Sequence, residues 1–225
     1  MIAKNLPVMQ LVKFRRLSER SRLTFTNNLK IPKKPKSESG GGNYWVRSVS
    51  GISNAFKNKD NKFIQEKIEA VTSVYDSAKL DGTITMYKRN LEILHNYIDF
   101  DFSTWCPPGD LQFLANPQLT LIVNDLSIQI IPNHIFSYEH KGEQKMGGIW
   151  FVCWLDGFKQ DDLGIFSEAL FRYLSFLYSR EYKIDPNYCS IVDILTMERL
   201  SYQQVLEGKI APLLEHTINT LNKYL

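Results

Sequence analysis

Cysteine is scarce in this chain of 225 residues, and long hydrophobic runs are missing. No stretch of about 18 consecutive apolar residues occurs, so we expect no membrane-spanning helix. The N-terminal residues do not follow the charged, apolar and small-residue order of a signal peptide. The cysteines are odd in number and widely spaced, which predicts neither a disulfide framework nor a zinc site: Cys106, Cys153 and Cys189. Together these absences predict a cytoplasmic protein that makes no membrane contact.

The remaining composition is that of a globular protein. Hydrophobic residues make up 44% of the chain and charged residues 23%, enough to bury a substantial core. At this length we expect one large domain, with or without an appendage.

Charge is distributed unevenly along the chain. The overall net charge is +3, yet residues 1–36 contain ten Lys and Arg residues and a single acid, Glu19. The remaining 189 residues therefore carry a net charge of −6. This asymmetry predicts an acidic partner for the N-terminal region: nucleic acid, an anionic lipid surface or the protein's own acidic body.

A Pro- and Gly-containing segment, KIPKKPKSESGGG, marks the boundary of the basic region. Pro32 and Pro35 oppose helix formation, and residues 40–42 are three consecutive glycines. We therefore predict a basic N-terminal arm and linker over residues 1–42, followed by a single α+β domain over residues 43–225.

Hydrophobic periodicity predicts the elements of this domain. Helical spacing covers residues 48–56, 61–78, 85–100, 161–182 and 211–225. Strand-like segments cover residues 119–138, with a turn at Asn124-Asp125, and, after a second turn at Lys141-Gly142, residues 146–155. These segments predict three consecutive antiparallel strands, of which the third is nearly all apolar and lies at the centre of the sheet. A further strand-like segment covers residues 188–202. The order predicts an α+β (mixed α/β) fold with N-terminal helices, a central mostly antiparallel sheet with a long helix packed on it, and a C-terminal helix.

The stretch IIPNHIFSYEHKGEQKMGGIW, residues 130–150, contains Pro132-Asn133 and then Glu143-Gln144-Lys145. Together with the order of elements around this motif, the chain resembles the PD-(D/E)XK superfamily, in particular its RecB-like branch, over about residues 61–202. The resemblance implies a restriction-endonuclease-like fold. In that family, two strand carboxylates hold Mg²⁺ and a Lys helps to activate the attacking water.

This chain departs from the family pattern at both motif positions. Asn133 stands where the family has Asp, and the predicted central strand reads Gly147-Gly148-Ile149 where the family has its acid and Lys. Three interpretations are open. Glu143 and Lys145 are turn charges; the chain has lost an ancestral metal site; or Glu143 and Lys145 form a rearranged site with Asp125 or Glu69, which would require Mg²⁺. Otherwise we expect no cofactor, no metal and no catalytic residue.

These observations lead to one main functional hypothesis and two alternatives. The main hypothesis is a non-catalytic, nuclease-like accessory or interaction protein associated with nucleic acid, in a defence or mobile-element system. Eight contacts between the arm and phosphates predict a slope of about −7 for log K against log salt concentration. The residues that would make these contacts are Lys13, Arg15, Arg16, Arg20, Arg22, Lys33, Lys34 and Lys36.

The first alternative is a protein-interaction or self-assembly module whose arm binds an acidic protein or a second copy of the chain. The second alternative is a metal-dependent nuclease. Aromatic residues beside predicted loops are candidates for a contact surface as well as for packing: Tyr44, Trp45 and Trp105.

Overall fold

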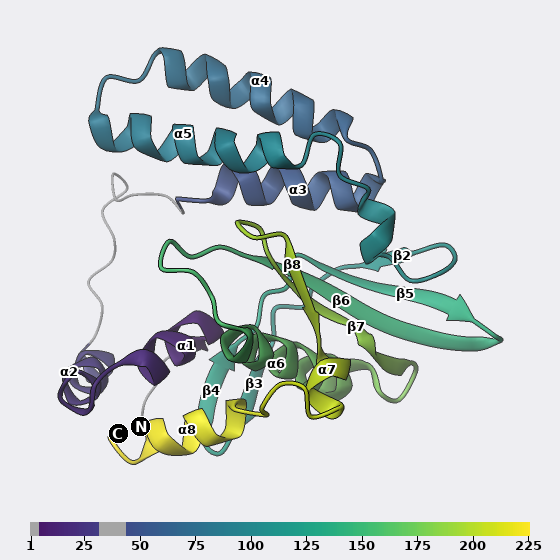
Figure 1. Cartoon of the computed structure of the whole chain (residues 1–225). Helices are drawn as coiled ribbons and strands as arrows, with labels where there is room; N and C mark the ends of the chain where they lie inside the picture. The colour runs from purple at the N-terminus through teal and green to yellow at the C-terminus, as the bar shows by residue number, and fades with distance from the viewer. Residues whose placement is uncertain (1–4, 32–43) are drawn as a thin grey trace.

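The computed structural model describes residues 5–31 and 44–225, which form helices and two β-sheets (Figure 1). The α-helices are α1 (Val8–Arg16), α2 (Glu19–Lys30), α3 (Val46–Asn58), α4 (Lys62–Asp76), α5 (Asp81–Asn96), α6 (Gln160–Tyr178), α7 (Tyr202–Leu206) and α8 (Leu214–Asn222), and a short 3-10 helix spans Phe102–Trp105. The strands are β1 (Leu6–Pro7), β2 (Gln112–Leu114), β3 (Thr120–Val123), β4 (Leu126–Gln129), β5 (His134–His140), β6 (Glu143–Val152), β7 (Lys183–Asp193) and β8 (Glu198–Ser201).

The larger sheet has five strands in the order β2-β5-β6-β7-β8, with β6 at its centre. Strand β6 runs parallel to β7, and α6 makes the crossover between them; the other neighbouring pairs are antiparallel. The turn from β5 to β6 lies at Lys141 and Gly142, whose φ angles are 54° and 76°. The predicted α+β class, the apolar central strand and this turn are confirmed.

The predicted strand region 119–138 does not form a single hairpin in this sheet. Strands β3 and β4 pair through the turn at Asn124 and Asp125, but they form a separate three-stranded sheet with β1. The run breaks between β4 and β5, where Pro132 cannot donate a ladder hydrogen bond. The expectation of three consecutive antiparallel strands in one sheet was therefore wrong.

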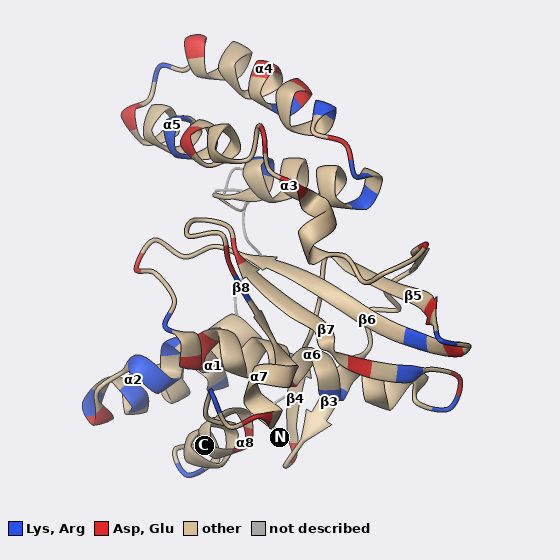
Figure 2. Cartoon of the chain, turned by 45° about the vertical axis from the view of Figure 1, so that its right-hand side comes forward, with Lys and Arg blue, Asp and Glu red and all other residues tan. Residues whose placement is uncertain are grey.

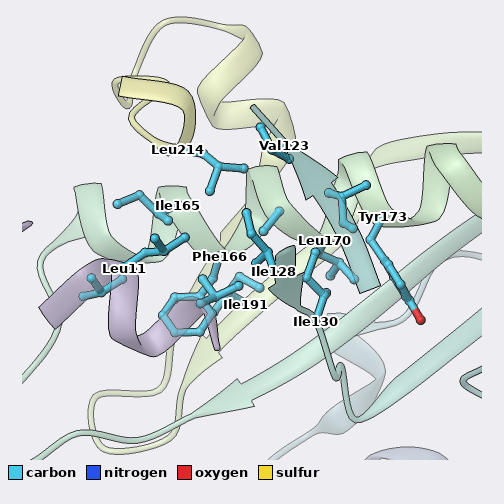
Figure 3. Packing of buried hydrophobic residues seen from close by; sticks show 14 of the residues in the cluster. Leu11, Val123, Ile128, Ile130, Ile165, Phe166, Leu170, Tyr173, Ile191 and Leu214 are labelled. Carbon is cyan, nitrogen blue, oxygen red and sulfur yellow. The ribbon is translucent and has the colours of Figure 1, made fainter. Parts of the chain in front are cut away.

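Two clusters of buried side chains lie on opposite faces of the larger sheet. The first cluster joins the sheet to α1, α6, α8 and the small sheet, and Figure 3 shows part of it. The second cluster joins the other face to α3, α4 and α5, which form a separate layer in Figure 1. Neighbouring residues of one strand serve different clusters: Ile191 belongs to the first and Val192 to the second. This is the alternation that a strand buried on both faces must show.

Helix α1, within the predicted basic arm, is part of the first cluster. Its apolar side chains Val8, Leu11, Val12 and Phe14 are at most 1% exposed. The beginning of the predicted arm is thus built into the body, whereas the predicted linker residues 32–42 lie outside the described residues. Every helix within residues 5–31 and 44–225 falls short of the length and apolarity that a bilayer span needs.

Candidate anion-binding site

In the structure, the residues of the nuclease-like motif are engaged by different partners. Glu143 begins β6 at the surface and pairs with Lys183 at 3.0 Å. Lys145 instead approaches Asp185 of β7, at 3.4 Å. Asp125 is an exposed turn residue of the other sheet. Glu143 and Lys145 are therefore neighbours on one face of β6, but Asp125 does not join them. The hydrogen bond from Lys183 and, after it, the Lys145 charge lower the pKa of Glu143.

Asn133 has a structural role just before β5. Its side-chain oxygen accepts a hydrogen bond from the backbone N–H of Phe151 at 2.8 Å, and its own N–H donates to Ile149 at 3.1 Å. Asn133 thus continues the hydrogen-bonded pairing of β5 with β6 by one residue. Within the described chain, no group of three or more His, Cys, Asp or Glu side chains is arranged to hold a metal ion.

The glycine pair in β6 reflects the shape of the neighbouring strand. Between Met146 and Gly148 the partner register on β7 advances from Ile184 to Cys189, so β7 bulges. A Cβ on Gly147 would lie 2.7 Å from the Tyr188 carbonyl oxygen. The bulge therefore requires glycine at this position.

A different group of charged residues gathers where α1 meets the start of α6. Arg15 pairs with Asp161 at 2.8 Å and with Asp162 at 3.0 Å, and Arg16 also pairs with Asp162. Asp162 is fully buried and additionally accepts the Lys159 backbone N–H at 2.8 Å, in a capping box at the start of α6. A buried carboxylate is tolerated here because both of its oxygens accept hydrogen bonds, from Arg15, Arg16 and the Lys159 backbone.

A surface pocket of about 480 Å³ opens beside these ion pairs, between α1, α2 and α8. Four cationic side chains line the pocket, and the carboxylates of Asp161 and Asp162 balance two of them. Two positive charges remain as a surplus when His216 is counted as neutral. The lining consists of Phe14, Arg15, Arg16, Arg22, Lys159, Leu213, His216, Thr217 and Thr220.

Arg22 of α2 and Lys159 each contribute one charge to this surplus, because no carboxylate of the described residues pairs with either of them. Arg22 donates from Nη2 to the Arg15 carbonyl oxygen at 3.0 Å, and its guanidinium lies 5.2 Å from the centre of the Phe14 ring. The buried Nε–H groups of Arg16 and Arg22 have no hydrogen-bond partner. Guanidinium groups fixed in this way suit a planar or tetrahedral oxyanion.

The other predicted phosphate-binding residues are divided between surface and interior. Arg20 is exposed on α2, and Figure 2 shows several basic residues on this helix. Lys13 is half-buried, with Nζ 5.9 Å from the Trp154 ring centre, and the Arg16 guanidinium lies 4.4 Å from the same ring. Lys33, Lys34 and Lys36 lie outside the described residues.

The aromatic contact candidates pack against the second cluster. Trp45 and Trp105 are 8% and 5% exposed. Tyr44 is half-buried, and its ring centre lies 4.6 Å from that of Trp45. These three residues pack within the protein and do not form an exposed aromatic surface.

No family model, curated protein or solved structure matches this chain.

The site contains residues that the sequence did not indicate. Lys159, His216, Thr217 and Thr220 line the pocket, more than 135 residues from the arginines they face. No local pattern links such distant positions. The only indication in the sequence was the uneven charge, from which binding of the basic segment to the protein's own acidic body was one of the predicted outcomes. Arg15 and Arg16 bind in this way, to Asp161 and Asp162.

Proposed function

We propose that this protein is a non-catalytic relative of restriction-endonuclease-like nucleases that binds the phosphate backbone of nucleic acid at the pocket between α1, α2 and α8. The order β5-β6-α6-β7 supports the relationship, because it follows the strand, strand, helix, strand plan of that fold. Asn133 and Gly147 at the motif positions support the loss of metal chemistry, since neither supplies a carboxylate.

The observation that carries the binding proposal is the surplus of positive charge at the pocket. Arg15 and Arg16 are already paired with Asp161 and Asp162, so a phosphate would be held mainly by Arg22 and Lys159. Exposed Arg20 extends the basic surface along α2. Because two of the predicted contacts are used internally, we expect a salt slope shallower than the value of about −7 for eight contacts.

The test is the anisotropy of a fluorescent DNA duplex titrated with protein at several NaCl concentrations. Removing one phosphate contact should weaken binding and make the slope of log K against log salt shallower by about 0.9. We expect this for Arg22→Gln and for Lys159→Gln. Lys62→Gln is the matched control, because Lys62 is 68% exposed on α4, where it pairs with Glu66.

Deleting the basic segment would not be a clean test, because deletion would also remove Leu11 and Phe14 from the core. Absence of duplex binding at low salt, or equal slopes for Arg22→Gln and the unaltered protein, would refute the proposal. Mg²⁺-dependent cleavage lost in Glu143→Ala would refute its non-catalytic part.

The molecular mass of the protein in solution distinguishes the interaction-module alternative from nucleic-acid binding. A dimer that becomes monomeric in Arg20→Gln, without any duplex affinity, would favour self-assembly over nucleic-acid binding.

A further inference from the structure

A second pocket, of about 400 Å³, lies on the other face of the larger sheet from the α1–α2–α8 pocket. Tyr138 of β5 and Lys145 of β6 are direct partners across the antiparallel pair, so their side chains share a face. The bulge of β7 places Asp185 and Tyr188 beside them, and Arg199 comes from β8. The close approach at Gly147 allows this arrangement.

Asp185 is fully engaged within the protein. It accepts hydrogen bonds from the Tyr138 hydroxyl at 2.7 Å, the Asn187 backbone N–H at 2.9 Å and the Asn187 side chain at 3.1 Å. Lys145 Nζ lies 3.4 Å from the same carboxylate. Burial alone would raise the pKa of Asp185, but these hydrogen bonds and the Lys145 charge hold it below its ordinary value. The carboxylate is therefore ionised and offsets the charge of Lys145.

Arg199 has no such counterion. It donates from Nε to the Ser190 hydroxyl at 3.0 Å and from Nη2 to the Asn187 carbonyl at 2.7 Å, and it lies 5.4 Å from the Tyr188 ring centre. These contacts fix the guanidinium, yet no carboxylate of the described residues pairs with it. Burial lowers the pKa of Arg199, since the charge is held partly out of water without an acidic partner.

We propose that this pocket binds a small organic carboxylate, whose anionic group pairs with the Arg199 guanidinium. Lys145, Arg199 and Asp185 leave one surplus positive charge when His140 is counted as neutral, which one carboxylate balances. A phosphate monoester carries about 1.5 to 2 negative charges at neutral pH and would overbalance it. A volume of this size falls within the range of small-molecule sites, about 300–1,000 Å³. The adjoining Tyr188 ring gives the rest of the ligand a flat surface to pack on.

The experiment titrates the ¹⁵N-labelled full-length protein with sodium benzoate at constant ionic strength and follows its ¹H–¹⁵N spectrum. We expect saturable shifts of the Asn187 and Tyr188 amides and of the Arg199 Nε–H signal. Arg199→Gln should weaken benzoate binding by about tenfold or more, because a charge-assisted hydrogen bond is lost. Arg199→Lys, which keeps the charge but loses the two-pronged geometry, should weaken it less.

Lys183→Gln is the matched control, because this lysine lies on β7, the strand next to that of Arg199, but is 64% exposed and pairs with Glu143. Its benzoate affinity should equal that of the unaltered protein. Inorganic phosphate forms the second arm of the titration and should bind more weakly than benzoate.

The proposal is overturned if the amide signals of Asn187 and Tyr188 do not shift. It is also overturned if phosphate binds more tightly than benzoate, or if both Arg199 variants bind benzoate as the unaltered protein does. If Arg199→Gln does not fold, the benzoate affinity of Arg199→Lys is compared with that of the unaltered protein, and equal affinities overturn the proposal. Duplex binding at the first pocket is scored separately with Arg22→Gln, so failure of one proposal leaves the other standing.

Discussion

The backbone around two single residues, Asn133 and Gly147, explains why this chain departs from the nuclease-like motif there. Gly147 lies where the β7 bulge approaches most closely, and Asn133 completes the pairing at the start of β5. Both positions are occupied by residues that suit the backbone around them. The stretch thus has a structural explanation independent of any metal chemistry.

Substituting Gly147 by Ala should destabilise the fold by about 1–3 kcal/mol, the usual cost of overpacking. The new Cβ would lie 2.7 Å from the Tyr188 carbonyl oxygen and 2.8 Å from the Tyr188 Cβ, so backbone must move. Gly82→Ala is the control, because no atom lies within 4 Å of its added Cβ and it sits in α5. Urea unfolding should show a loss for the first variant and none, or a small gain, for the second.

Asp193 should make the stability of the protein dependent on pH. Burial raises its pKa above the ordinary 3.8, and hydrogen bonds from Leu195 and Thr196 only partly offset this. Because the folded state favours the protonated carboxyl, its contribution to stability is full below pH 3.8 and is lost as pH rises through the folded pKa.

Asp193→Asn should therefore raise the Tm relative to the unaltered protein more at pH 8 than at pH 4. About 1 kcal/mol corresponds to roughly 2–4 °C in a chain of this size. Calorimetry at the two pH values measures the difference, and a larger gain at pH 4 would contradict the assignment.

Among the elements, α1 differs most from what its sequence suggests. Its basic residues indicate a surface segment, but its apolar side chains pack against α6 and α8 while Arg15 and Arg16 pair with the start of α6. The helix therefore positions the anion-binding pocket and also contributes to the core.

Leu11→Ala should cost about 2–5 kcal/mol of folding free energy, because a fully buried side chain leaves a cavity. Leu23→Ala on neighbouring α2 should change stability by no more than about 0.5 kcal/mol, since Leu23 is 51% exposed. Denaturation midpoints of the two variants test whether α1 is integral. Equal midpoints would mean that it is not.

Over the whole molecule, the larger sheet connects the two clusters. Because neighbouring residues of β7 serve opposite faces, loss of one cluster removes the support of the other. We expect Leu11→Ala to unfold in one transition, with coincident midpoints by tryptophan fluorescence and far-UV circular dichroism. Trp150 and Trp154 report on the first cluster, Trp45 and Trp105 on the second. Separate midpoints would show that the clusters unfold independently.

The sequence by itself determined the class of fold, the main helices, the turns at Asn124-Asp125 and Lys141-Gly142, and the apolar centre of β6. These depend on periodicity and on residues that accept positive φ, which are local properties. Only the tertiary structure decided that β3 and β4 leave the main sheet, that Arg15 and Arg16 pair with Asp161 and Asp162, and that Lys145 meets Asp185. Those contacts join residues 40 to about 150 positions apart, and they form because burying apolar faces brings distant polar groups together, which no local spacing encodes.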